Sequence, residues 1–196
     1  MIETYIQLVI LFLVIFDPLA SLSVFVSSTN KKLAYEQHRV AILSVLVAGI
    51  ISFIVLLLGS TLLTLFDTTI QDFKIAGGII LILLGINMVM GKSIVEESVM
   101  KESSAPAIAA IIGSPILAGP ASITTIIISA HEYGQIPTGI SIIIVLIITG
   151  FIFWFGAEIH RKLGETFEKV MSAILGLVTI SWGVRFIREV LVNILV

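Results

Sequence analysis

Long apolar stretches, separated by short polar segments, follow one another along the whole chain. Three of them, residues 40–66, 103–130 and 133–157, carry no charged residue. A helix needs roughly 20 apolar residues to cross about 30 Å of hydrocarbon at about 1.5 Å per residue. The pattern therefore predicts an all-α membrane protein with six transmembrane segments, at roughly residues 4–27, 40–65, 74–91, 106–130, 138–157 and 170–194.

Two polar segments separate these spans more widely than the others do. The segment "GKSIVEESVMKESSA" (91–105) lies near the middle of the chain and has no strong apolar period. We interpret residues 1–91 as a first unit of three spans, residues 92–105 as a polar cytoplasmic connection and residues 106–196 as a second unit of three spans.

The second polar segment, residues 157–171, has a different pattern. Ile159, Leu163, Phe167 and Val170 recur at spacings of three and four residues, with charges between them. This spacing is typical of an amphipathic helix, so the sequence predicts a short interfacial helix near residues 158–169. An ordinary polar loop is the alternative.

Composition narrows the class of protein. Apolar residues make up 58% of the 196 residues and charged residues 12%, against about 45–50% and about 25% in soluble domains. The chain has no cysteine, which excludes disulfides and cysteine-based metal sites, and it has no basic cluster that would suit nucleic acid. The first apolar stretch lacks a basic flank and continues past Asp17, so we expect a span in the lipid bilayer and not a cleaved signal peptide.

Basic residues predict the orientation, because cytoplasmic loops carry more lysine and arginine. With both termini outside, eight of the 11 basic residues fall on the inner side and three on the outer side. We therefore expect a multi-pass protein of the cell membrane with both termini outside. The inner group is Lys31, Lys32, Arg39, Lys92, Lys101, Arg161, Lys162 and Lys169, and the outer group is Lys74, Arg185 and Arg188.

The two halves of the chain resemble each other at two places. "DPLASLS" at Asp17 matches "GPASITT" at Gly119 once one residue is skipped, and "GIILILLGIN" at Gly78 matches "GLVTISWGVR" at Gly176. Chance similarity between apolar segments is the alternative. Each half would hold three spans, an odd number, so the second half would enter the membrane from the opposite side. The sequence therefore predicts a 3+3 inverted-topology repeat, a common plan of secondary transporters.

The first and fourth spans each have a proline near the middle. Proline inside a helix removes a backbone hydrogen bond, but at the first helical position it costs nothing, and aspartate or glycine is a good residue before it. Asp17-Pro18 and Gly119-Pro120 therefore indicate helix starts. We expect broken helices in spans one and four, with the second half of each starting near the bilayer midplane.

These two breaks form the candidate binding site. The first turn of a helix has unpaired N–H groups and a partial positive charge, which suits a carboxylate. Lipid cannot satisfy such groups, so the breaks should face protein or a wet cavity. Hydroxyl side chains follow both breaks, Ser23 among them, and can bond either a ligand or the freed carbonyls. The predicted substrate-binding residues are Asp17, Pro18, Ser21, Gly119, Pro120, Ser122, Thr124 and Thr125.

Asp17 is predicted to be the only acidic residue at membrane depth. Its candidate roles are to pair with a substrate ammonium, to bind Na⁺, to carry a proton, or only to cap the helix that follows. Asn87, one turn from the inner end of the third span, is a second candidate for ion coupling, with an interfacial position as the alternative. We expect no metal and no cofactor apart from a coupling Na⁺ or H⁺.

Other function classes fit the sequence less well. No histidine, cysteine or carboxylate pair is expected at membrane depth, so we expect no enzyme activity, and no Walker motif indicates use of ATP. A secondary transporter and a passive channel are both compatible with helices that break near the midplane.

Three motifs resemble those of one known family. They are "DPLASLSVF" after the first apolar stretch, "FKIAGGIILILLGINMVMG" from Phe73 and "SPILAGPASITT" from Ser114. In this order, and over essentially the whole chain, the sequence resembles the MarC family of six-span membrane proteins, whose members include a transporter of small neutral amino acids. Members usually have glycine at the position of Ala121, many have asparagine at that of Asp17, and glycine is frequent at that of Ala20.

The resemblance implies transport of a small neutral amino acid such as glycine or alanine, with or without coupling to Na⁺ or H⁺. An aspartate at position 17 would attract cations more strongly than the asparagine of other members. The alternatives are a passive channel or an exporter of another small polar solute. A homo-oligomer is compatible with all of these functions.

Overall fold

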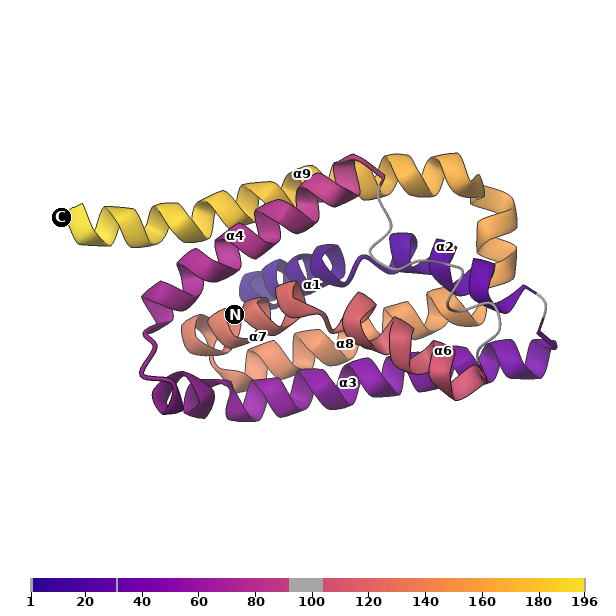
Figure 1. The fold of residues 1–196 in the computed structure, drawn as a ribbon, viewed down its shortest axis with the longest axis horizontal. Coiled ribbons are helices and arrows are strands. Elements are labelled where there is room, and N and C mark those ends of the chain that lie inside the picture. The colour runs from indigo at the N-terminus through magenta and orange to yellow at the C-terminus, as the bar shows by residue number, and fades with distance from the viewer. Residues whose placement is uncertain (1, 31, 92–103, 196) are drawn as a thin grey trace.

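The computed structural model of the chain describes residues 2–30, 32–91 and 104–195, which fold almost entirely into helices (Figure 1). Of the predicted connection 92–105, residues 92–103 lie outside the described residues. The first half contains α1 (Ile2–Phe16), α2 (Pro18–Thr29), α3 (Ala34–Leu65) and α4 (Ile70–Val89). The second half contains α6 (Ala105–Ile111), the π-helical segment η1 (Ile112–Leu117), α7 (Pro120–Tyr133), α8 (Gln135–Trp154) and α9 (Gly156–Leu195).

The helices are long and apolar enough for a multi-pass membrane protein. Within the described residues, five helices could cross a membrane by length and composition, and a sixth crossing results if one bent pair counts as a single span. Large apolar side chains cover the outside, among them Ile50, Leu57 and Phe151. A water-soluble monomer rarely exposes so much apolar surface, whereas lipid solvates it. The prediction of an all-α integral membrane protein is confirmed.

Two helix interruptions lie where the sequence has Asp-Pro and Gly-Pro. α1 ends at Phe16 and α2 starts at Pro18, and Asp17 between them has the left-handed backbone angles φ 38° and ψ 68°. Aspartate is one of the few residues besides glycine that adopt this region readily. In the second half, α7 starts at Pro120, and the chain bends by 55° between the segment Ala105–Leu117 and α7. Both helices thus begin with a proline. No helix hydrogen bond is lost there, because an N–H at the first helical position would have no partner within the helix.

α4 and α9 cross through glycines, with their backbones in direct contact. A Cβ atom on Gly78 would lie 2.6 Å from the carbonyl oxygen of Gly183, and one on Gly85 would lie 2.5 Å from that of Gly176. From the first contact to the second, the residue number rises on α4 and falls on α9, so the two helices are antiparallel. They lie side by side in the bundle (Figure 1). Only residues without a side chain permit this approach, which is common where helices cross in membranes.

The two halves are interleaved. α1 packs against α8 and α6 against α3, while α2 packs against α9 and α7 against α4. Phe25 of α2 also stacks on Phe153 of α8, with 4.9 Å between the ring centroids. Each half therefore covers apolar surface of the other. The buried core includes Phe12, Phe16, Leu22, Leu81, Ile112, Ile126 and Ile142.

α9 contains both the predicted interfacial segment, residues 158–169, and the last span. Gly164 interrupts it with φ 76° and ψ 155°, so a short helix precedes a long one. Leu163, Phe167 and Val170 of the apolar stripe are exposed, whereas Glu168 is only 1% exposed. Polar residues of membrane helices face the inside of the bundle because lipid lies outside, so the stripe points outward. The depth of this segment in the membrane stays a prediction.

Candidate functional site

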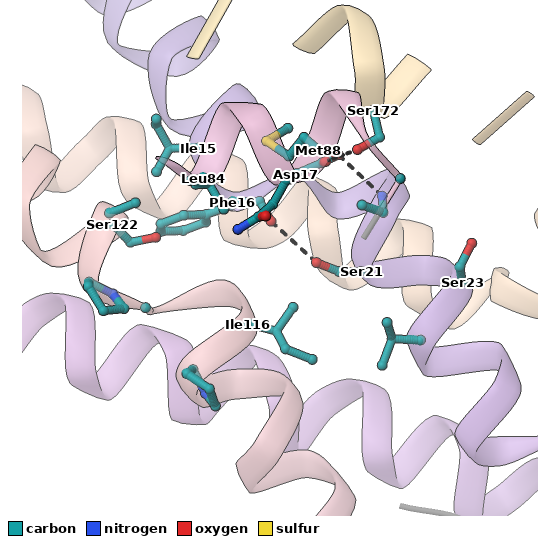
Figure 2. Close-up of a pocket in the computed structure, with 18 of the residues that line it drawn as sticks. Ile15, Phe16, Asp17, Ser21, Ser23, Leu84, Met88, Ile116, Ser122 and Ser172 are labelled. Carbon is teal, nitrogen blue, oxygen red and sulfur yellow. Dashed lines mark hydrogen bonds between the residues drawn. The ribbon is translucent and has the colours of Figure 1, made fainter. Parts of the chain in front are cut away.

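A cavity of about 460 Å³ lies where the two interruptions approach each other (Figure 2). The junction of α1 and α2 forms part of its wall, and the end of η1 with the start of α7 forms another part. The last turns of α4 and a segment of α9 complete it. Six of the nine residues predicted for substrate binding or ion coupling line this cavity: Asp17, Ser21, Asn87, Gly119, Pro120 and Ser122.

Asp17 has a buried side chain, 7% exposed, that contacts two different helices. One carboxylate oxygen, Oδ1, accepts a hydrogen bond of 3.2 Å from the backbone N–H of Ala20 and so caps α2. The other, Oδ2, accepts a hydrogen bond of 2.8 Å from the hydroxyl of Ser172 in α9 (Figure 2). Asp17 therefore caps α2, joins it to α9 and borders the cavity at the same time, so the capping role does not prevent contact with a ligand.

Ser21 and Ser122 make the same kind of bond at the two interruptions. The hydroxyl of Ser21 donates to the carbonyl of Phe16 at 3.3 Å, and that of Ser122 donates to the carbonyl of Leu117 at 2.6 Å (Figure 2 shows the first). Both serines thus reach back to the last carbonyl before the break. The sequence allowed these hydroxyls to bond either a ligand or a carbonyl freed by the break. In this structure both hydroxyls bond the carbonyl. Each hydroxyl oxygen keeps lone pairs that can accept a hydrogen bond from a ligand.

The start of α7 differs from the start of α2 in having no carboxylate at its cap. Gly119 holds the cap position with extended backbone angles, and among the described residues no side chain caps this start. A Cβ atom on Gly119 would overlap the carbonyl oxygen of Pro115, so the position requires glycine. Ala121 and Ser122, whose N–H groups belong to the unpaired first turn, both line the cavity. The positive end of α7 therefore faces the cavity.

Three of the predicted residues are not part of the cavity wall. Pro18 is buried as the first residue of α2. The hydroxyl of Thr124 donates to the carbonyl of Pro120, and that of Thr125 to the carbonyl of Ala121, both at 2.8 Å within α7. Thr124 also packs against α4, where a Cβ atom on Gly77 would overlap its methyl group. These threonines therefore face helix neighbours in this structure.

Glu168 is a cavity residue that the sequence did not identify. Its Oε2 accepts a short hydrogen bond from the hydroxyl of Ser23, and its Oε1 lies 2.9 Å from Nδ1 of His160. Asp17 is therefore not the only buried acid of this cavity, because Glu168 is 1% exposed and lines it as well. That Asp17 is the only acidic residue at membrane depth stays a prediction. A signal was present: Glu168 lies on the polar side of the amphipathic stripe, which faces inward in a membrane protein.

The match to known sequences extends over both halves of the bundle. Residues 2–195 match the family described as MarC family integral membrane protein. The chain belongs to the MarC family. The resemblance to this family that the three motifs indicated is confirmed.

The MarC family member has relatives in several organisms. It is 28% identical to the UPF0056 membrane protein YhcE of Escherichia coli (strain K12) over 180 residues, 87% of this chain and 84% of the relative. It is 27% identical to a UPF0056 membrane protein of Aquifex aeolicus over 192 residues, 93% and 90% of the two chains. A UPF0056 membrane protein of Pyrococcus horikoshii is 30% identical over 175 residues, 87% of this chain and 86% of the relative. No solved structure matches the chain.

An ionic cluster joins the two halves of this MarC protein at the end away from the cavity. Lys74, near the start of α4, pairs with Glu132 of α7 and with Glu189 of α9, the latter at 2.9 Å. Nε of Arg185 lies 2.7 Å from the other carboxylate oxygen of Glu189. A separate hollow of about 280 Å³ borders this cluster, with Glu132 and Arg185 in its wall.

Proposed function

We propose that the protein is a secondary transporter of small neutral amino acids, of the size of glycine or alanine. The substrate would bind in the cavity between the two helix interruptions. The observation that carries this proposal is that one cavity contains both a buried carboxylate, on Asp17, and a helix start without a capping carboxylate, at Gly119.

These two groups match the two charges of a zwitterion. The ammonium group of an amino acid would pair with Asp17, and its carboxylate would accept hydrogen bonds from the first turn of α7, where the helix dipole favours negative charge. The cavity volume of about 460 Å³ lies within the range of about 300–1,000 Å³ that is common for small-molecule sites. Leu84 and Ile116 belong to the rest of the wall, which suits a small uncharged side chain.

Contacts across the bundle support an inverted repeat with a broken span in each half. The sequence match pairs Gly78 with Gly176 and Gly85 with Gly183, and in the bundle Gly78 contacts Gly183 while Gly85 contacts Gly176. Such an exchange of partners is what a two-fold axis between equivalent helices produces. The packing of α1 on α8 and of α6 on α3 has the same exchanged form. Ser21 and Ser122, which follow the two interruptions, also make equivalent bonds, each within its own half.

The position of the cavity supports a transporter that is closed at one end. Its wall reaches Gly91 and Lys169, which the distribution of basic residues assigns to the cytoplasmic side, while the ionic cluster around Lys74 lies at the other end. We propose that this conformation opens towards the cytoplasm. Because the chain has no cysteine, single cysteines report orientation. Asn30→Cys should react only from the cytoplasm and Gln71→Cys only from outside, and the reverse would contradict the assignment.

A passive channel is the alternative, and it would need a continuous path. Within the described part of the chain, the cavity and the hollow beside Glu132 are separate, which favours a carrier. A carrier alternates between two states with the site open to either side in turn, whereas a channel does not.

Counterflow in proteoliposomes tests this proposal. Vesicles loaded with unlabelled glycine or alanine and diluted into trace labelled substrate should accumulate label transiently, because a carrier exchanges one molecule for another. Leucine and lysine should exchange poorly. Equilibration of label without transient accumulation would indicate a channel, and no flux with any small amino acid would refute the proposed function.

A further inference from the structure

We propose that Glu168 and His160 together bind the proton that drives transport. This inference rests on the proposed function and adds the coupling ion and its binding residues, which lie apart from Asp17. It starts from a contact: Oε1 of Glu168 lies 2.9 Å from Nδ1 of His160.

The two side chains differ in how much of their surface is exposed. The side chain of Glu168 is 1% exposed and borders the cavity, whereas that of His160 is 31% exposed. A proton can therefore pass between the surface of the molecule and the buried carboxylate through the two nitrogens of the imidazole ring. This arrangement connects the surface of the molecule near the kink of α9 with the interior of the cavity.

The kink at Gly164 makes the contact between Glu168 and His160. The two residues are eight positions apart, and in a straight helix they would be separated by about 12 Å along the axis at about 1.5 Å per residue. The backbone angles of Gly164, φ 76° and ψ 155°, turn the chain so that the short first helix of α9 brings His160 beside Glu168. Glycine is favoured at this position because other residues rarely adopt a positive φ.

The chemistry of the pair favours a proton over Na⁺. Hard cations prefer a shell of oxygen ligands. Here one carboxylate oxygen faces a ring nitrogen and the other accepts the hydrogen bond of Ser23. Within the described residues no three His, Cys, Asp or Glu side chains gather around a common centre. A carboxylate and an imidazole in direct contact can instead hold one additional proton between them.

Few other charged groups face this pair. Lys169, the next residue in α9, and Asp17 from the junction of α1 and α2 line the same cavity. Within the described residues, α4, η1 and α7 contribute no charged side chain to the cavity wall. The proton balance is simple: one proton is taken up by the pair from water on one side and released to water on the other side, and the amino acid is unchanged.

Protonation of the pair would act on the substrate site through Ser23. The bond from Ser23 to Glu168 joins α2 to α9, and Ser172, one turn further along α9, donates to Asp17. A change in the charge of Glu168 alters the first bond and therefore the position of α2 against α9. The carboxylate that we propose for the substrate ammonium lies at the start of the same helix.

Proteoliposome assays of Glu168→Gln and His160→Gln test this inference. Two rates are compared for each protein: counterflow of glycine at equal pH on both sides, and net glycine uptake driven by a pH gradient of either direction. Each variant should lose gradient-driven uptake by roughly tenfold or more relative to its own counterflow rate, because exchange moves no net proton whereas driven uptake needs a group that takes up and releases one. Glu158→Gln is the matched control, since Glu158 is an exposed acid in the same helix and should keep both rates.

The outcomes separate this inference from the proposed function. Absence of counterflow in the unmodified protein would refute transport itself, and the inference with it. Counterflow without any response to a pH gradient in the unmodified protein would overturn proton coupling alone. Undiminished gradient-driven uptake by both variants would show that the proton binds elsewhere. If Glu168→Gln does not fold, His160→Gln, changed at a partly exposed position, decides the question.

Discussion

Ser172 donates a hydrogen bond of 2.8 Å to Oδ2 of Asp17, which joins residues 155 positions apart in the sequence. In the same two helices, Ser23 donates to Glu168 over a separation of 145 positions. In one bond the acid is the cap of α2 and the serine belongs to α9, and in the other bond the serine belongs to α2 and the acid to α9. Two carboxylate–serine bonds therefore hold the start of the second helix against the kinked part of the last one.

Replacement of Asp17 should separate its capping role from its charge. Asp17→Asn keeps the cap, because asparagine caps helices about as well as aspartate and also tolerates positive φ. The variant should fold but bind glycine about tenfold more weakly, since hydrogen bonds to charged groups contribute about 1.5–3 kcal/mol. The measurements are glycine affinity and thermal stability in detergent.

Asp17→Leu provides the contrast, because it removes the charge and the cap together. It should lower thermal stability as well as binding, with a loss of about 0.5–2 kcal/mol for the cap alone. If Asp17→Asn binds glycine as the unmodified protein does, the carboxylate is only a helix cap.

Gly119 should tolerate substitution less well than Pro120. A Cβ atom on Gly119 overlaps the carbonyl oxygen of Pro115, and a larger side chain would enter the cavity. Gly119→Leu should therefore abolish counterflow. Pro120→Ala should retain most of it, because alanine is acceptable at the first helical position. Normal transport by Gly119→Leu would place the substrate away from the start of α7.

The crossing of α4 and α9 should depend on glycine at each contact. A Cβ atom on Gly85 would lie 2.5 Å from the carbonyl oxygen of Gly176, so Gly85→Ala must push the helices apart, at a cost of about 1–3 kcal/mol. Gly150→Ala in α8 is the matched control, since its Cβ would lie 3.7 Å from Val45, an ordinary contact distance. Thermal unfolding followed by size-exclusion chromatography should show a lower midpoint for Gly85→Ala only.

Removal of Lys74 should loosen the end of the bundle away from the cavity. Lys74→Met leaves Glu132 and Glu189 without their shared cation, so α4, α7 and α9 lose an ionic contact. A cysteine at Ser129, which lines the hollow there, should then react several-fold faster with a membrane-impermeant thiol reagent. The double change Lys74→Glu with Glu132→Lys should restore part of the slow rate. An unchanged rate in Lys74→Met would show that the cluster does not hold this end closed.

Local chemistry made the helix starts predictable. Asp17-Pro18 and Gly119-Pro120 carry capping and first-turn signals within two adjacent residues, and α2 and α7 start at these prolines. The use of the hydroxyls was less predictable. Thr124 and Thr125 point along α7 to carbonyls four residues back, a bond that any buried threonine can make within its own helix.

The amphipathic stripe could indicate that Glu168 faces inward, but its contacts are contained in no local pattern. Its partners Ser23 and His160 reach it only because α2 packs against α9 and because Gly164 kinks the chain. The same stripe of apolar residues would place Glu168 in solvent in a water-soluble protein. The burial of this acid therefore follows from the surrounding lipid and from tertiary packing together.

The glycine contacts between α4 and α9 also determine which parts of the protein can move. Helices that meet through side chains can slide, because rotamers change, but helices that meet through backbone at two points, seven residues apart on α4, are locked in register. Ile82 already lies beside Gly183, so the contact leaves no room for a side chain at this glycine. α4 and α9 must therefore move as one rigid body, and any rearrangement that exposes the cavity to the other side has to take place in the helices packed around that pair.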